Sequence, residues 1–229
     1  MVEFYKNFIR NVIRWYKDEI NAICTFLRGI VSQEALKITG KYTPVYQCLR
    51  FDFLGTIENL PNNDNRNPLN CRYDTNKEKL KNIIVFMVGA DALGCEYIKN
   101  YSLMGISCKK GKLTTNYNDN ISLSNLNRQF LFNKNDMKEN TSKSFCAKRE
   151  ALKINKDMKI QDYQLLINDD TRYRFNDEFI EKQNILISAV DNLSARKYID
   201  DLSTFFNKIY LNSGTEGTKA NNEIYDQFI

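Results

Sequence analysis

The feature that most constrains this chain of 229 residues is an unbroken apolar stretch that ends at a glycine. Residues Ile83–Val88 predict a buried strand, and the sequence GADALG at residues 89–94 predicts a turn that opens a helix. A strand that leads through such a turn into a helix presents backbone N–H groups where a phosphate can bind. The stretch therefore predicts a Rossmann-like unit with a nucleotide site.

Further strand and helix patterns alternate toward the C-terminus. We expect strands at residues 83–88, 112–117, 158–165, 185–190 and 208–211, the last of the set, and helices at residues 93–104, 142–154 and 194–206. This alternation predicts an α/β fold with a doubly wound, mainly parallel, Rossmann-like sheet. Ligands of such sheets bind beyond the carboxyl ends of the strands, where Gly89, Asp119 and Asp191 lie.

The N-terminal part has a different pattern. Residues 1–40 predict an amphipathic helical segment that ends at Gly40, and Val45–Phe53 predicts a strand. The first helix has basic residues between its apolar positions, so it could lie on a membrane surface. We favour the other interpretation, in which it packs on a neighbouring domain. Residues 59–76 are rich in Asn and predict a linker. The expected domains are thus 1–58, a linker at 59–76, and a nucleotide-binding domain at 77–229.

Composition excludes several classes of site. The chain has no histidine, which excludes Ser-His triads, Cys-His nucleophile pairs and His-ligated metals. None of the six cysteines forms a C-x-x-C pair, which argues against a zinc knuckle and fits a reducing compartment. The net charge of +5 is modest and no apolar run is long enough for a membrane span, so we expect neither nucleic acid nor membrane as a partner.

The turn at residues 89–94 departs from the G-x-G-x-x-G pattern at its middle position, where Asp91 replaces glycine. A carboxylate there faces any bound polyphosphate. Two like charges about 4 Å apart repel by about 4 kcal/mol at an effective dielectric constant of about 20. An ordinary strand–helix turn without a ligand is therefore an alternative interpretation.

Polar residues follow the second and fourth predicted strands. Asn125, Arg128 and Gln129 can bind phosphate or ribose oxygens, and Lys143 begins a helix, where a phosphate ligand is well placed. Asp191, which is followed by Asn192, can hold Mg²⁺ at a strand end. The alternatives are plain: Ser124 or Asn125, and likewise Asp191-Asn192, can be helix caps, and the two basic residues can be ordinary surface residues.

Taken in order, these stretches resemble the adenylation domain of ubiquitin-activating enzymes of the single-chain type. The family turn GAGAIGCE corresponds to GADALGCE at residues 89–96, and the family sequence SNLNRQFLF is identical at residues 124–132. The patterns ALDNxxARxY and SGTxGTK correspond to AVDNLSARKY at 189–198 and SGTEGTK at 213–219. Residues 26–53 resemble the end of the inactive adenylation half, and the resemblance covers residues 24–222.

The resemblance implies a ThiF/MoeB-type fold and ATP-dependent activation of ubiquitin or a ubiquitin-like protein. Mg-ATP and the C-terminal glycine would form an acyl adenylate, and the acyl group would then pass to a cysteine. Arg128 and Lys143 would be the catalytic phosphate ligands, and Asp191 the Mg²⁺ ligand. The implied nucleotide-binding set is Gly89, Ala92, Gly94, Asp119, Asn125, Arg128, Gln129, Lys143, Asp191 and Asn192.

The resemblance also implies what lies outside these residues. The thioester cysteine and the ubiquitin-fold domain of the family are absent, so we expect a fragment that is inactive alone. Its partners would be the inactive adenylation half and, through the full-length protein, a ubiquitin-conjugating enzyme, in cytoplasm and nucleus. The family's ribose-binding aspartate aligns with Tyr117, and Lys143 aligns only across a gap of two residues.

Three other hypotheses remain. Asp91 and Tyr117 favour a degenerate, non-catalytic module that binds ubiquitin or a partner subunit. A sulfur-carrier adenylating enzyme of the ThiF/MoeB type is disfavoured by the upstream segment at residues 26–53 and by the missing zinc cysteines. A dehydrogenase is remote, because no acidic residue is suitably placed for an NAD ribose after the second strand.

Overall fold

The computed structural model describes residues 21–40, 43, 78–216 and 219–226. The chain divides into two units, Met1–Thr75 and Asn76–Ile229. In the first unit the described part is chiefly helix α2 (Asn21–Lys37), which ends before the predicted stop at Gly40. The helix predicted before residue 21, the strand at Val45–Phe53 and the linker at 59–76 lie outside the described residues.

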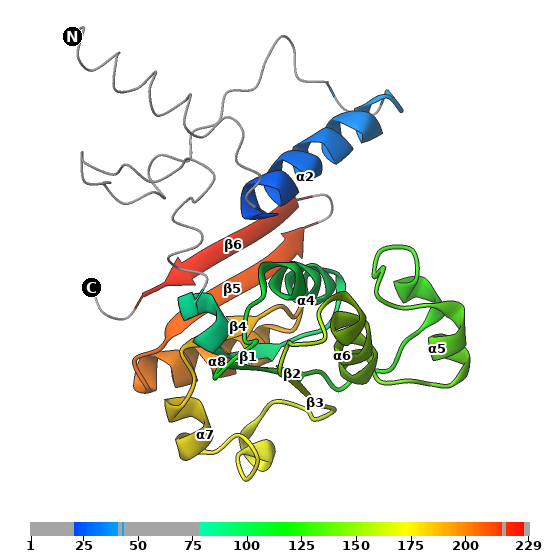
Figure 1. Ribbon diagram of the computed structural model, residues 1–229. Helices are drawn as coiled ribbons and strands as arrows, with labels where there is room; N and C mark the ends of the chain where they lie inside the picture. The colour runs from blue at the N-terminus through cyan, green and yellow to red at the C-terminus, as the bar shows by residue number, and fades with distance from the viewer. Residues whose placement is uncertain (1–20, 41–42, 44–77, 217–218, 227–229) are drawn as a thin grey trace, which may run out of the picture. The chain divides into compact units, whose positions relative to one another are not determined.

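The second unit is built on a six-stranded sheet with the strand order β3-β2-β1-β4-β5-β6 (Figure 1). All neighbouring strands are parallel except β5 and β6, which pair antiparallel. The strands are β1 (Ile84–Val88), β2 (Lys112–Asn116), β3 (Ile160–Tyr163), β4 (Ile185–Ser188), β5 (Ile209–Glu216) and β6 (Lys219–Tyr225). The predicted doubly wound, mainly parallel α/β fold is confirmed.

The connections between parallel strands contain the helices. These are α4 (Ala92–Met104), α5 (Lys134–Lys138), α6 (Lys143–Ile154), α7 (Asp177–Glu181) and α8 (Leu193–Phe205), with short 3₁₀ turns at Leu123–Asn125 and Asp169–Thr171. Helices α4 and α6 pack on each other (Figure 1). Because parallel crossovers are right-handed and the strand order reverses after β3, α8 covers the opposite face.

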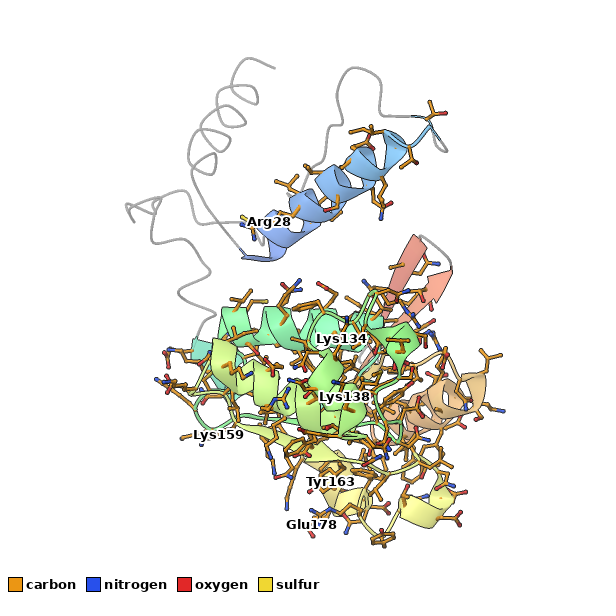
Figure 2. The ribbon with its side chains drawn as sticks, turned by 90° about the vertical axis from the view of Figure 1, so that its right-hand side faces the viewer. Arg28, Lys134, Lys138, Lys159, Tyr163 and Glu178 are labelled. Atoms are coloured by element: carbon orange, nitrogen blue, oxygen red, sulfur yellow. The ribbon has the colours of Figure 1, made fainter. Side chains whose placement is uncertain are left out.

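Strand β1 is central because its residues are apolar on both faces. Four of its five residues are buried, and it pairs with β2 on one side and β4 on the other. On one face Phe86 contacts the rings of Phe175 and Phe179, with centroids 4.8 and 5.1 Å apart. Tyr163, labelled in Figure 2 at the end of β3, packs edge-on against Phe175. Burial of this run fixes the carboxyl end of β1 at the centre of one sheet edge.

The short helix α5 is held to α6 by a buried carboxylate. Asn133 caps α5, whose first and last residues, Lys134 and Lys138, are labelled in Figure 2. Asp136 is 1% exposed, and its carboxylate pairs with Arg149 of α6 at 2.7 Å. This pair fixes the loop that follows β2 and so helps to position Lys143.

Two buried cysteines lie in helices α4 and α6. Cys95 of α4 and Cys146 of α6 are both fully buried, and burial raises the pKa of each thiol to about 12. Cys95 is therefore a core residue. Thiols with such high pKa values are poor nucleophiles.

One element was wrongly predicted. The strand expected at residues 208–211 as the last of the sheet is instead an eight-residue strand, β5, and β6 follows it. The sequence of β6, KANNEIY, has no apolar alternation, and residues 220–225 are exposed. Its place in the sheet comes from backbone pairing with β5, which leaves little signal in the side chains. No helix in the described part of the chain is long and apolar enough to cross a membrane.

Candidate functional site

The turn after β1 brings two strand ends and a helix start into close contact. Gly89 has a φ of +119°, and a Cβ there would lie 2.2 Å from the backbone oxygen of Ala189, beyond the end of β4. A Cβ on Gly94, in the first turn of α4, would lie 2.5 Å from the backbone oxygen of Gly89. Both glycines are therefore required by the backbone packing of the turn. Ala92 is the first residue of α4, as a phosphate-binding turn requires.

Asp91 lies at the centre of a polar cluster contributed by four segments. Its Oδ1 accepts hydrogen bonds from Lys143 Nζ at 2.7 Å and from Gln129 Nε2 at 2.8 Å. Its Oδ2 accepts a hydrogen bond from the hydroxyl of Tyr117. Lys143 Nζ also lies 3.5 Å from Asp119 Oδ2 and 4.9 Å from the centroid of the Tyr117 ring. We call Asp91, Tyr117, Gln129 and Lys143 the Asp91 cluster.

The cluster is mostly shielded from water. Lys143 is 3% exposed and Gln129 is fully buried, while the Asp91 side chain is 26% exposed. Burial by itself raises the pKa of Asp91, but the hydrogen bonds from Lys143 and Tyr117 outweigh it and hold the pKa below its usual range. Burial and the hydrogen bond to Asp91 both raise the pKa of Tyr117. Asp91 is thus a carboxylate and Tyr117 a neutral donor near pH 7.

The start of α6 places Lys143 within this cluster. The backbone N–H of Lys143 donates to the backbone oxygen of Asp119 at 3.1 Å, and Ser142 is the N-cap residue. The prediction that Lys143 begins a helix is confirmed, but its side chain is paired with Asp91.

The SNLNRQF segment follows β2 as a compact loop. Asn125 is 6% exposed, and its Oδ1 accepts hydrogen bonds from the N–H and hydroxyl of Ser122, both at 2.9 Å. Neither Ser124 nor Asn125 is the N-cap residue, because both lie inside the 3₁₀ turn that Ser122 caps, and the Asn125 side chain completes the capping box. Arg128 is exposed, and its guanidinium donates to the backbone oxygen of Ser124 at 2.8 Å.

Two cavities open at this edge of the sheet. One, of about 250 Å³, lies beside the turn and is lined by Asp91, Arg128, Asp191 and Arg196 among others. The other, of about 160 Å³, lies beyond the ends of β1, β2 and β4. Its lining includes Tyr117, Asp119, Ile167, Val190, Asp191 and Asn192. Asp191 lines both cavities, so it marks their junction.

Asp191 and Asn192 have different environments. Asn192 caps α8: its Oδ1 accepts hydrogen bonds from the N–H of Ser194 at 2.9 Å and of Ala195 at 3.4 Å. Asp191 is exposed at the junction of the cavities. Among the described residues no three acidic or thiol side chains group into a metal site. A single carboxylate suits Mg²⁺ only where phosphate oxygens and water supply the remaining ligands.

Sequence reasoning missed Arg196 as a site residue. Its Nε donates to the backbone oxygen of Val190 at 2.8 Å, and its Nη1 donates to Asn212 Oδ1 at 2.9 Å. A Cβ on Gly214 would lie 2.7 Å from Arg196 Nη2, so the glycine of β5 makes room for the guanidinium. Arg196 also lines a third cavity of about 230 Å³ with Glu223. The signal was its position one helical turn after Asn192, within AVDNLSARKY.

Comparisons with known proteins agree with this architecture. Residues 63–226, more than half of the chain, match the ThiF family. The chain is 36% identical over 238 residues to ubiquitin-activating enzyme E1 1 of Candida albicans (strain WO-1), covering 96% of this chain and 23% of the relative. It is 37% identical over 218 residues to human ubiquitin-like modifier-activating enzyme 6, covering 90% and 20%. The chain thus spans about a fifth to a quarter of the length of these relatives.

Solved structures show the same fold. A crystal structure of E. coli MccB with ATP has a TM-score of 0.53 and 26% identity, covering 65% of this chain and 40% of MccB. A crystal structure of PaaA has a TM-score of 0.58 at 22% identity, covering 72% and 50%, which is a likeness of fold alone. The resemblance to ubiquitin-activating enzymes is confirmed, and with most of its length matched, the chain belongs to the ThiF family.

Proposed function

We propose that this chain supplies the nucleotide site for ATP-dependent adenylation of the C-terminal glycine of ubiquitin or a ubiquitin-like protein. One observation carries the proposal: two cavities meet at Asp191, at the carboxyl ends of the central strands. Ligands of doubly wound sheets bind at this edge. The names of the relatives and the ATP in the MccB structure support the choice of nucleotide and substrate.

The smaller cavity suits a nucleoside. Val190 and Ile167 offer apolar surface to a base, and Asp119 and Asn192 offer polar atoms to ribose hydroxyls. The larger cavity is lined by Arg128 and Arg196, which suit phosphates and the incoming carboxylate, and also by the carboxylates of Asp91 and Asp191. Guanidinium groups bind phosphate and carboxylate oxygens with two parallel hydrogen bonds.

The chemistry requires no histidine. A carboxylate oxygen of the terminal glycine attacks the α-phosphorus of ATP, an O–P bond forms, and the bond to the bridging oxygen of pyrophosphate breaks. Arg128 would neutralise charge on the phosphates, and Asp191 would hold Mg²⁺ at the cavity junction. Bound Mg²⁺ supplies charge neutralisation of the phosphate oxygens. Such reactions depend on positioning and electrostatic stabilisation.

The wider assignment follows from the same proposal. Residues 77–229 would be the active adenylation domain, residues 1–58 part of the inactive half, and residues 59–76 their linker. The conjugating enzyme would be reached through further domains, in cytoplasm and nucleus.

A calorimetric titration with ATP, with and without Mg²⁺, tests the proposal. Asp191→Ala is expected to abolish the Mg²⁺-dependent part of ATP binding, because the variant removes the only proposed metal ligand. Asp201→Ala, an exposed aspartate on the same helix α8, is the matched control and should bind as the native chain does. Unchanged affinity in Asp191→Ala would rule out the metal role.

A second candidate function is favoured by the Asp91 cluster. Lys143, expected to bind phosphate, is already paired with a carboxylate, as in a non-catalytic module kept for binding ubiquitin or a partner subunit. Titration with ubiquitin in the absence of ATP separates the two functions. A non-catalytic module binds equally with and without ATP, whereas an adenylation site releases pyrophosphate once ATP and ubiquitin are both present.

A further inference from the structure

The two positions at which this chain departs most from the family pattern are direct partners. Asp91 stands where the family turn has glycine, and Tyr117 aligns with the family's ribose-binding aspartate. The residues are 26 positions apart, and the Tyr117 hydroxyl donates to Asp91 Oδ2. At Tyr117 the chain lacks the carboxylate that the family has, and at Asp91 it has a carboxylate where the family has none.

The orientation of Asp91 is informative. Asp91 is the N-cap residue of α4, and an aspartate at an N-cap normally accepts a hydrogen bond from its own helix. In the described structure the Asp91 side chain makes no capping hydrogen bond. Its two oxygens accept instead from Lys143, Gln129 and Tyr117, three donors from other segments. The carboxylate therefore behaves as a bound anion rather than as a helix cap.

The donors around Asp91 are committed to it. Lys143 and Gln129 are buried, and Lys143 Nζ already lies 2.7 Å from Asp91 Oδ1 and 3.5 Å from Asp119 Oδ2. Gln129 directs its amide nitrogen at the carboxylate, and within the described residues its buried Oε1 has no hydrogen-bond partner. An unpaired buried acceptor is costly, so the contact with the anion fixes the amide orientation.

We propose that Asp91 is an internal carboxylate ligand of Lys143 that takes the place of a nucleotide phosphate and so determines how many phosphates the site accepts. This inference rests on the proposed nucleotide site. The nucleoside cavity remains open beyond β2 and β4, whereas each phosphate added to the ligand approaches a carboxylate that already holds the phosphate lysine. The site accordingly favours adenosine or AMP over ATP.

An affinity series tests this specificity directly. Adenosine, AMP and ATP, each with and without Mg²⁺, are titrated into the native chain, Asp91→Gly and Asp91→Asn. In the native chain affinity is expected to fall from adenosine to ATP; in Asp91→Gly the order reverses and ATP binds at least about tenfold more tightly. Asp91→Asn keeps the side-chain size without its charge and is expected to fall between the two. Asp157→Asn, an exposed aspartate before β3, is the matched control.

Circular dichroism confirms that each variant is folded, and Asp91→Asn carries the test if Asp91→Gly does not fold. Adenosine affinity should stay within about twofold in Asp91→Asn, because this variant keeps a polar partner for the Tyr117 hydroxyl at the nucleoside cavity. If native chain and variants bind ATP equally tightly, Asp91 does not select against phosphates, and the proposed function stands without this inference. If neither ATP nor adenosine binds any variant, Asp91 is not what limits binding, and both this inference and the nucleotide site are overturned.

Discussion

The two ends of the candidate site differ in how they are filled. At the turn after β1, the polar groups suited to a phosphate already pair with Asp91. Beyond β2 and β4, a cavity of about 160 Å³ is lined by residues that include Tyr117, Asp119 and Asn192. At one end the chain thus supplies its own anion, whereas at the other end it leaves an open cavity.

This difference teaches that one end of the site can change while the scaffold stays intact. Gly89 and Gly94 keep the close approach of β1, β4 and α4, because backbone atoms occupy the space that any side chain would need. Asp91 lies between them at a position where a side chain fits. The turn therefore holds a charged side chain without loss of its backbone packing.

The largest predicted effect comes from a substitution that disrupts both ends of the site at once. Gly89→Ala introduces a Cβ 2.2 Å from the backbone oxygen of Ala189 at a φ of +119°. We expect the free energy of unfolding to fall by about 3 kcal/mol or more, measured by chemical denaturation. Gly105→Ala is the control: its φ is +71° but nothing lies within 4 Å of the added Cβ, so it should cost only about 1 kcal/mol. Equal losses in both variants would contradict the packing argument.

A smaller effect on stability is expected from a substitution that changes only the phosphate end of the site. Lys143→Ala leaves the Asp91 carboxylate without its cation, and losing one partner of a buried pair is expected to lower the free energy of unfolding by about 3 kcal/mol. Lys153→Ala, an exposed lysine on the same helix α6, should change it by less than about 0.5 kcal/mol. A native-like stability of Lys143→Ala would show that the pair does not hold the turn in place.

The pH dependence of stability gives a further test of the phosphate end of the site. Because the pKa of Asp91 is lowered in the folded chain, its stabilising effect is fully present above the ordinary value of 3.8 and is lost as the pH falls through the folded pKa. The stability difference between the native chain and Asp91→Asn should therefore be constant above about pH 5 and shrink below pH 3.8. Denaturation curves from pH 3 to pH 7 measure it, and a difference that persists unchanged in acid would contradict the charged pair.

The smallest predicted effect belongs to the nucleoside end. Leu166 is 53% exposed and lines the smaller cavity, so Leu166→Ala should weaken adenosine binding by about two- to fivefold and leave stability unchanged. Leu103→Ala, on α4 and 50% exposed, is the control for loss of a surface leucine. If both variants bind adenosine as the native chain does, the base does not lie against Leu166.

Sequence alone predicted the sheet but not the internal pairing of the site. The strand at β1 and the helix starts of α4, α6 and α8 lie within one or two residues of their predicted positions, because long apolar runs and periodic stripes carry that signal. Strand β6 lacks such a pattern and was missed. The sequence indicated that Asp91 would repel a polyphosphate, yet its contact with Lys143 joins residues 52 positions apart and depends on the folded geometry.

The site residues show the same limit. Their types and order indicated a nucleotide site, and Gln129 and Lys143 do lie beside the turn. Which atoms they pair with could not be read from spacing, since Asn125 is used by its own loop and Asn192 by its own helix. Arg196 was passed over because its position one helical turn after Asn192 does not show where its guanidinium lies, which the structure shows beside Gly214.

The buried thiols on α4 and α6 provide two independent measures of local unfolding. Cys95 and Cys146 are fully buried with pKa values of about 12, so an alkylating reagent reaches them only when their helix leaves the sheet. The labelling rate of each thiol then counts how often that helix detaches. Since α4 begins at the Asp91 turn and α6 begins at Lys143, these rates report how firmly the ion pair ties the two helices together.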